Sequence, residues 1–107
     1  MDDRTLLLEA FRAAIAGVEP EMATARVASG LDFSHAHRIV AISVGKASAP
    51  MARGLATAVD LADGVVVAPG HLEAPLPLIV GGHPVPNEGS EAGARRALEL
   101  AASAGPD

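Results

Sequence analysis

The 107-residue sequence contains no cysteine, no tryptophan and no tyrosine, and it has only two phenylalanines. Without cysteine, neither a disulfide framework nor a thiolate metal site can form. With so few aromatic residues, the core must be built from Ala, Val, Leu and Ile, which suits the packed layers of an α/β fold. The length is that of one domain, and we treat residues 1–107 as a single unit.

Positive charge is also scarce. The sequence has eight Lys and Arg residues and 13 Asp and Glu residues, which gives a net charge of −5. No Lys/Arg cluster is present, so we expect no nucleic-acid partner. The N-terminal stretch MDDRTLLLEAF is acidic and resembles neither a signal peptide nor a membrane span. We therefore expect a cytoplasmic protein without membrane contact, and homo-oligomerisation stays open.

Hydrophobic spacing and capping residues predict seven elements in the order ααβαββα. The first helix is capped by Asp2 or Asp3, and the second begins near Pro20 and stops at Gly30. Short apolar runs predict strands at 38–44, 64–68 and 76–82. Further helices are predicted at 47–59 and at 86–105, the last one capped by Asn87 or Ser90. On the last helix we expect Leu98 and Ala102 to face the core.

This order predicts an α/β, Rossmann-like fold with a parallel or mixed sheet and flanking helices. The connection from Ala68 to Pro77 is too short for a helical crossover, so we expect the second and third strands to form a hairpin or to be non-adjacent. The sequence ends at AGPD, directly after a helix, and three strands are few for such a sheet. We therefore expect an incomplete part of a larger α/β domain.

Two phosphate-binding motifs are absent. Where a P-loop needs its first glycine the sequence has Val40, and where it needs Ser or Thr the sequence has Ala47. The dinucleotide fingerprint G-x-G-x-x-G follows none of the predicted strands. Neither motif therefore indicates a nucleotide.

Lys46, in ISVGKASAPM (42–51), stands between a predicted strand and the start of a helix. The ordinary interpretation is a surface lysine with its stem packed on the sheet rim. The functional interpretation is a cation at the carboxyl edge of an α/β sheet, where helix N-termini and ligands meet. The Ser48 hydroxyl would then be a second donor. Both interpretations stay open on position alone.

Two further polar residues follow predicted strands. In GGHPVPNEGS (81–90), two prolines stiffen the loop that carries His83. His83 is then either a proton carrier or hydrogen-bond donor in a site, or simply part of a rigid turn. His71 follows the second strand and is expected at the same edge of the sheet as Lys46. His35 and His37 lack a third ligand nearby, so we expect no metal site there.

Three stretches, VGKASAPMA (44–52), GVVVAPGH (64–71) and GGHPVPNEGS (81–90), together resemble the type II glycerate kinases. That family contains the glycerate 2-kinases and is sometimes labelled hydroxypyruvate reductase. The resemblance spans nearly the whole chain but only the N-terminal portion of a family member. It implies ATP- and Mg²⁺-dependent phosphorylation of D-glycerate to 2-phosphoglycerate, in a cleft between an α/β N-terminal domain and a C-terminal domain that this sequence lacks.

The resemblance also implies roles for single residues. Lys46 matches the active-site lysine of the family's Gly-Lys-Ala, His83 matches its His-Pro-x-Pro, and His71 matches its Gly-His. Gly82 and Asn87 stand where Ala and Asp are common. The family's Ser-Gly-Gly loop and its nucleotide-binding residues are expected beyond this sequence, so we expect the 107 residues alone to be inactive.

The hypothesis from sequence is thus the N-terminal part of a glycerate 2-kinase. Lys46 is the expected catalytic residue, and Lys46, Ser48, His71 and His83 are the expected substrate-binding residues. ATP and Mg²⁺ are cofactors implied by the resemblance alone. The alternatives are a hydroxypyruvate reductase-type oxidoreductase and a non-catalytic α/β binding module.

Overall fold

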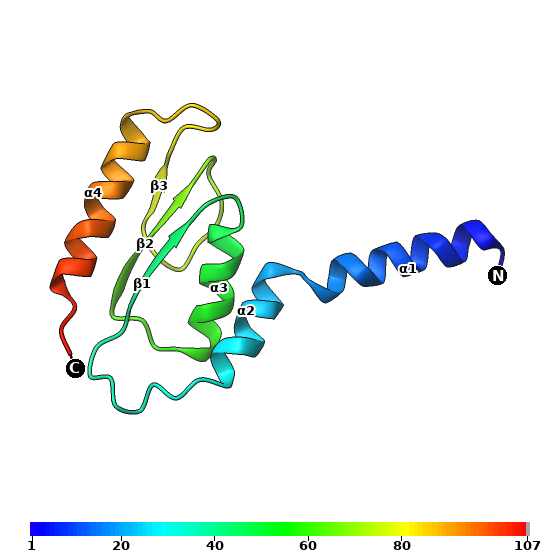
Figure 1. The fold of residues 1–107 in the computed structure, drawn as a ribbon, viewed down its shortest axis with the longest axis horizontal. Helices are drawn as coiled ribbons and strands as arrows, with labels where there is room; N and C mark the ends of the chain where they lie inside the picture. The colour runs from blue at the N-terminus through cyan, green and yellow to red at the C-terminus, as the bar shows by residue number, and fades with distance from the viewer. Residues whose placement is uncertain (107) are drawn as a thin grey trace.

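The computed structural model describes residues 1–106 and contains four helices and three strands within that range. The elements are α1 (Asp3–Gly17), α2 (Pro20–Ser29), β1 (Val40–Val44), α3 (Ser48–Ala58), β2 (Asp63–Ala68), β3 (Leu78–Val80) and α4 (Glu88–Ser103). Their order confirms the predicted ααβαββα arrangement. The fold is α/β, with an open parallel sheet as in an incomplete Rossmann-like domain (Figure 1).

The sheet has the order β1-β2-β3, and both pairs of strands are parallel. The prediction that the second and third strands form a hairpin or lie apart was therefore wrong, because Val66 pairs with Leu78 and Ala68 with Val80. β3 has only three residues. The chain that leaves the carboxyl end of β2 therefore has to run back only about 10 Å to reach the amino end of β3. The extended segment 69–77 covers that distance without a helix, and its Ala74 and Leu76 pack on the core.

Small side chains bring the layers of the fold close together. On one face of the sheet, Ala49 and Ala52 of α3 pack against Val66 and Ala68 of β2, and all four are almost completely buried. α2 packs on α3 at Gly54, where a Cβ atom would overlap the backbone of Glu21. α4 covers the opposite face of the sheet (Figure 1).

α4 presents a different face to the sheet from the predicted one. Gly93 and Leu100 are buried, whereas Leu98 is 71% exposed and Ala102 is also exposed. The prediction for Leu98 and Ala102 was therefore wrong. Gly93 decides the orientation, because a Cβ atom there would lie 2.8 Å from both methyl groups of Val67. The smallest residue thus faces the sheet, and α4 approaches β2 closely at this point.

α1 projects from the body as a single helix (Figure 1). The Asp2 side chain caps it, accepting a hydrogen bond of 2.7 Å from the Thr5 N–H, and this bond holds the pKa of Asp2 below its ordinary value. No residue of α1 is buried, and its Leu7 and Phe11 are more than 60% exposed. Among residues 1–106, no helix combines the length and the apolar character that crossing a bilayer requires.

Candidate functional site

The turn between β1 and α3 places Lys46 at the carboxyl edge of the sheet. Gly45 has a φ of 117°, a backbone conformation that favours glycine. Its N–H donates to the Val67 carbonyl at 2.9 Å, and its own carbonyl accepts from the Ser48 N–H at 3.2 Å. The turn is thus fixed to β2 on one side and to the start of α3 on the other. Lys46 extends from it as an exposed residue.

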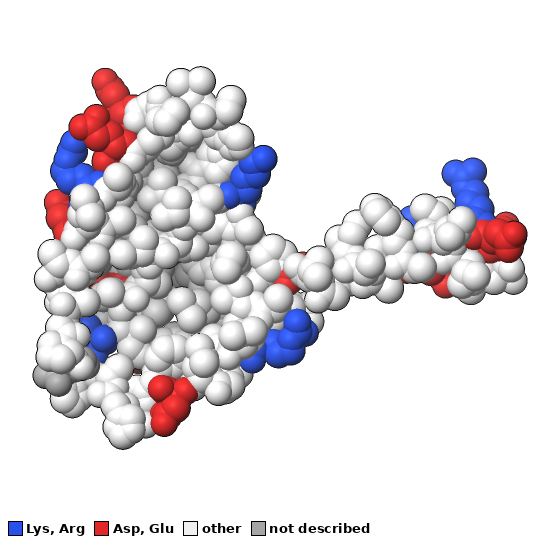
Figure 2. All heavy atoms as spheres, in the orientation of Figure 1, with Lys and Arg blue, Asp and Glu red and all other residues white. Residues whose placement is uncertain are grey.

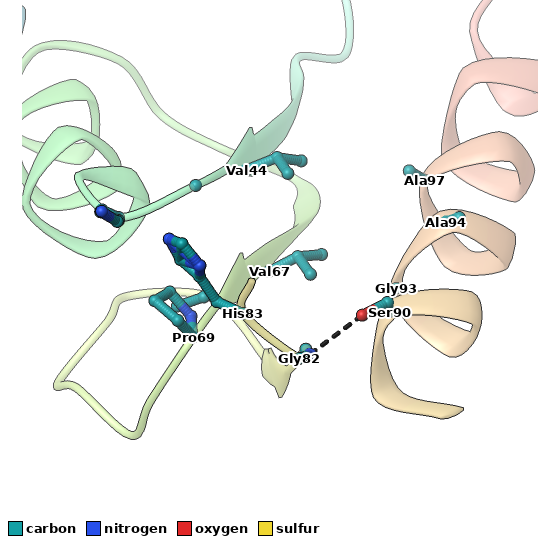
Figure 3. A pocket seen from close by; sticks show the side chains of 13 residues that line it. Val44, Val67, Pro69, Gly82, His83, Ser90, Gly93, Ala94 and Ala97 are labelled. Carbon is teal, nitrogen blue, oxygen red and sulfur yellow. Dashed lines mark hydrogen bonds between the residues drawn. The ribbon is translucent and has the colours of Figure 1, made fainter. Parts of the chain in front are cut away.

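A pocket of about 440 Å³ opens beside Lys46, between the ends of the strands and α4. Val44 and Val67 point across it toward α4 (Figure 3). The lining is mostly glycine, alanine, valine and proline, and Lys46 and His83 are its two ionisable members. The full lining is Val44, Gly45, Lys46, Val67, Ala68, Pro69, Gly81, Gly82, His83, Ser90, Gly93, Ala94 and Ala97.

The loop that carries His83 is attached to the first turn of α4. The Gly82 N–H donates to the Ser90 Oγ at 2.9 Å (Figure 3). The same hydroxyl oxygen accepts from the Asn87 N–H at 3.1 Å, and the Ser90 N–H donates to the Asn87 Oδ1 at 3.1 Å. This reciprocal capping box begins α4 and also holds the loop before it. Sequence reasoning named Asn87 and Ser90 as cap candidates but missed that Ser90 anchors Gly82.

Gly82 itself is required by close packing. A Cβ atom at this position would overlap the Val85 carbonyl oxygen and would lie 3.0 Å from the Asn87 side chain. The loop of this chain therefore folds back more tightly than an alanine at position 82 allows.

Two of the residues predicted for the site lie elsewhere. Ser48 is 1% exposed, and its hydroxyl donates to the Val67 carbonyl at 3.2 Å, so it joins α3 to β2 and does not line the pocket. The expectation that Ser48 offers a hydroxyl to a ligand is corrected accordingly. His71 is exposed in the connection after β2 and is not part of the pocket lining either. The structure therefore brings together Lys46 and His83 only.

The pocket has a positive and otherwise weakly polar character. Every ion pair within residues 1–106 involves an arginine, so Lys46 forms none there. The neighbouring Ala47 is the N-cap residue of α3 and provides no side-chain cap, so the first turn of α3 adds positive potential. A cation beside an apolar hollow is suited to an anionic group such as a phosphate or a carboxylate.

The described residues do not fit Mg²⁺. This cation takes oxygen ligands, usually including carboxylates. The pocket lining contains no carboxylate, and no cluster of three or more His, Cys, Asp or Glu residues forms within residues 1–106. The Mg²⁺ that the family resemblance implies therefore has no site among these residues, and it takes part in no step derived from them.

An open parallel sheet, helices on both faces and a pocket at the carboxyl ends of its strands define the class of open α/β domains. Residues 6–107 match the family described as "Domain of unknown function (DUF4147)", and the chain belongs to that family. Together with the two similar proteins described next, this match confirms the resemblance to the N-terminal portion of the glycerate kinases.

Two relatives come from Pyrococcus horikoshii. The chain is 34% identical to a glycerate 2-kinase over 77 residues, which are 69% of this chain and 18% of that relative. It also resembles the crystal structure of the PH0495 protein, with a TM-score of 0.79 and 30% identity, over 97% of this chain and 27% of that one. The chain thus spans less than a third of the length of either relative.

Proposed function

We propose that this chain forms the N-terminal part of a glycerate 2-kinase, which transfers a phosphoryl group from ATP to the 2-hydroxyl of D-glycerate. The observation that carries the proposal is the position of Lys46, a cation without an ion-pair partner in residues 1–106, beside an apolar pocket at the carboxyl edge of the sheet. The similarity to a glycerate 2-kinase supports the same reaction.

The chemistry of phosphoryl transfer matches what the pocket offers. The reaction gathers negative charge on the phosphoryl oxygens, and glycerate adds a carboxylate, so catalysis depends on positioning and on charge neutralisation. ATP, when bound, supplies the transferred group. The Lys46 ammonium group contacts either the phosphoryl oxygens or the glycerate carboxylate. The apolar lining strengthens this attraction once the bound substrate displaces water from the pocket.

His83 has a supporting role in this proposal. A neutral imidazole has one donor and one acceptor nitrogen, which suit a carboxylate and a hydroxyl of the substrate. The Gly82–Ser90 hydrogen bond holds the backbone next to His83 and so fixes the point from which its side chain extends. His83 therefore orients glycerate, while Lys46 neutralises charge.

The test is a coupled assay of the full-length protein with ATP and D-glycerate, in which ADP and 2-phosphoglycerate are both measured. We expect stoichiometric formation of the two products, and no turnover by the 107-residue chain alone. NADH-dependent reduction of hydroxypyruvate without 2-phosphoglycerate would instead establish an oxidoreductase. Binding of glycerate without turnover of either kind would establish a binding module.

A further inference from the structure

Two serines beside the candidate site have hydroxyl groups that are already occupied. Ser48 is 1% exposed, and its hydroxyl donates to the Val67 carbonyl. Ser90 lines the pocket, but its hydroxyl accepts from the Gly82 N–H at 2.9 Å and the Asn87 N–H at 3.1 Å, and it donates to the Asn87 Oδ1 at 3.3 Å. A hydroxyl group offers one donor and two acceptor positions, so none is left at Ser90 for a ligand.

The turn that carries Lys46 is closed on a single oxygen atom. The Gly45 N–H donates to the Val67 carbonyl oxygen at 2.9 Å, and the Ser48 hydroxyl donates to the same oxygen at 3.2 Å. These two donors flank Lys46 in the chain, so the Val67 carbonyl holds the backbone on both sides of it. The Ser43 hydroxyl adds a third connection, because it donates to the Ser48 carbonyl at 2.7 Å.

The loop that carries His83 is closed in the same way. Gly82 and Asn87, at the two ends of this loop, both donate their backbone N–H groups to the Ser90 Oγ. Residues 83–86 between them are exposed, and they form no hydrogen bond within residues 1–106. The position of His83 therefore depends on the Ser90 hydroxyl.

Both anchoring oxygens belong to the packed body of the fold. Val67 lies in β2, the central strand, which pairs with both neighbours. Ser90 lies in the first turn of α4, and this turn packs on β3, since a Cβ atom on Gly89 would overlap the Val80 carbonyl oxygen. Figure 2 shows an uncharged surface at the top of the molecule, where Figure 1 places the loop before α4. No ion pair within residues 1–106 involves this loop, so Ser90 is what attaches it.

We infer that Ser48 and Ser90 are positioning residues, Ser48 for Lys46 and Ser90 for His83, and that they hold both side chains in place before a substrate binds. The inference rests on the proposed function, in which Lys46 neutralises charge and His83 orients glycerate. Groups that are already in position need no reorganisation during the reaction, and a displacement of about 1 Å can cost up to about 10²-fold in rate. Neither serine touches the substrate.

The two serines should affect different kinetic constants of the full-length protein. Lys46 acts on charge that grows in the transition state, so Ser48→Ala should lower kcat on the order of 10-fold with little change in KM. His83 contacts glycerate before and during the reaction, so Ser90→Ala should raise the KM for D-glycerate on the order of 10-fold. The KM for ATP should stay within about twofold, because His83 orients only glycerate. A general loss of folded protein would change neither KM.

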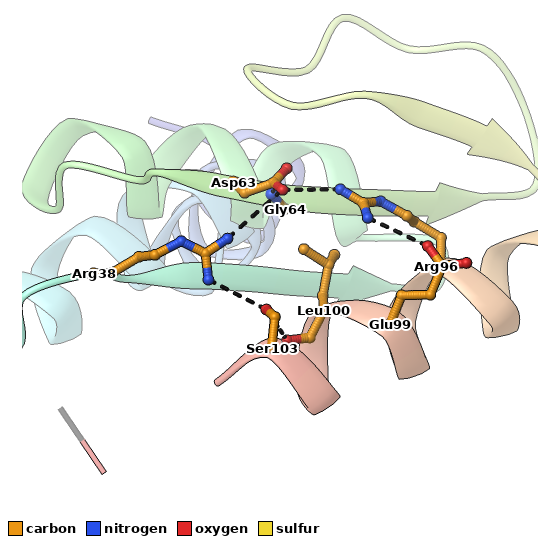
Figure 4. Close-up of polar contacts among 7 residues, drawn as sticks. All are labelled: Arg38, Asp63, Gly64, Arg96, Glu99, Leu100 and Ser103. Atoms are coloured by element: carbon orange, nitrogen blue, oxygen red, sulfur yellow. Dashed lines mark hydrogen bonds and ion pairs between the residues drawn. The ribbon is translucent and has the colours of Figure 1, made fainter. Parts of the chain in front are cut away.

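Ser103→Ala is the matched control, at the other end of α4. Its hydroxyl also forms two hydrogen bonds, since it donates to the Leu100 carbonyl at 2.7 Å and accepts from Arg38 at 3.2 Å (Figure 4). All three Ser→Ala variants should lower Tm by about 2–4 °C, but Ser103→Ala should leave kcat and both KM values unchanged. Ser90→Thr keeps the hydroxyl and should recover most of the affinity for D-glycerate. Unchanged constants for Ser48→Ala and Ser90→Ala, or equal changes for Ser103→Ala, would overturn the inference.

NMR of the substrate-free, full-length protein tests the positioning without any reaction. With isotope-labelled histidine, the ring signals of His83 are identified by their loss in His83→Gln. Ser90→Ala should shift these signals and Ser103→Ala should not, while Ser48→Ala should shift the backbone N–H signal of Lys46. Unshifted signals in Ser90→Ala or Ser48→Ala would contradict the inference at any level of activity. If the signals shift but the wild type does not phosphorylate glycerate, the proposed function fails while the positioning roles stand.

Discussion

The two ends of the sheet use their charges in different ways. At the amino end, the Asp63 carboxylate accepts a hydrogen bond of 2.9 Å from Arg96 and lies 3.8 Å from Arg38 (Figure 4). It also accepts from the Gly64 N–H at 2.8 Å. The Gly64 bond first, and then the two arginines, hold the pKa of Asp63 below its ordinary value. The charges at this end neutralise one another and connect α4 to β1 and β2.

At the carboxyl end, Lys46 has no such partner within residues 1–106, and the surrounding pocket is lined by small and apolar residues. A cation without a partner in residues 1–106 adds no ion pair to the fold, and in the proposed function it binds an anionic substrate group. We therefore expect the charges at the amino end to stabilise the fold and the Lys46 charge to act on the substrate. The amino end should affect stability without affecting activity, and the carboxyl end should do the reverse.

The largest expected effect is that of Lys46→Ala on the activity of the full-length protein. Removal of one preorganised group that stabilises transition-state charge typically costs about 3–4 kcal/mol, so kcat should fall on the order of 10²–10³-fold. Tm should stay level or rise slightly, because a cation leaves the positive end of α3. Steady-state kinetics and thermal melts measure both quantities.

Two variants serve as controls for Lys46. Lys46→Arg should restore activity only in part, since a planar guanidinium does not replace a compact ammonium group. Arg95→Ala removes a well-exposed cation whose partner is Glu91 on the same helix, and it should leave kcat unchanged. An unchanged kcat for Lys46→Ala would show that Lys46 is an ordinary surface residue, and parallel losses of kcat and Tm would make it structural.

Gly45→Ala should have the next largest effect, because it affects the turn that presents Lys46. A side chain at a φ of 117° is strained, and the variant should lose about 1–3 kcal/mol of unfolding free energy. It should also lower kcat by displacing Lys46. Gly70→Ala is the matched control, since a Cβ atom at Gly70 would have no other atom within 4 Å and the residue has no positive φ. Urea unfolding should show a change within about 0.5 kcal/mol for Gly70→Ala, and equal losses for the two variants would contradict the strain argument.

Arg96→Met tests the amino end and should have a smaller effect. The variant loses the contacts with Asp63 and Glu99 but keeps an unbranched apolar stem on the sheet. The side chains of Arg96 and Asp63 are each about a third exposed, so solvent screens their ion pair. The Tm should therefore fall by less than it does for Gly45→Ala. Activity of the full-length protein should not change. A fall in kcat at unchanged Tm would show that the two ends of the sheet are not functionally separate.

The smallest effect is the pH dependence of the Asp63 cluster. The pKa of Asp63 is lower in the folded protein than its ordinary value of 3.8, so its contribution to stability is present above 3.8 and is lost as the pH falls through the folded pKa. Asp63→Asn removes that contribution. The difference in Tm between wild type and Asp63→Asn should be constant near neutral pH and should shrink toward zero in acid. A difference that grows in acid would have the wrong sign for this mechanism.

Local patterns in the sequence predicted most of the elements. Asp2, Pro20, Gly30 and Asn87 begin or end helices where capping rules place them, because a cap acts on backbone groups within one turn. The β-branched runs around Val40–Val44 and Asp63–Ala68 form strands for an equally local reason. The candidate site was predictable to the extent that Lys46 and His83 directly follow strands.

Other predictions failed where distant segments decide the outcome. The parallel pairing of β2 with β3 depends on the packing of Ala74 and Leu76 on the core, which no local pattern shows. Leu98 has the right spacing for a buried face, but the contact between Gly93 and Val67 turns α4 so that Leu98 is exposed. The sequence predicted that the Ser48 hydroxyl donates to a ligand, but in the structure it donates to the Val67 carbonyl.

The amino-acid sequence by itself determined the order of the elements, their caps, and the placement of Lys46 and His83 after strands, because these follow from interactions between residues close in the chain. Tertiary structure alone decided that Lys46 and His83 line one pocket while Ser48 and His71 do not, and that β1 is an edge strand within residues 1–106. Those outcomes depend on which backbone groups and side chains meet across the sheet. They are contacts between residues far apart in the chain, and no local pattern encodes them.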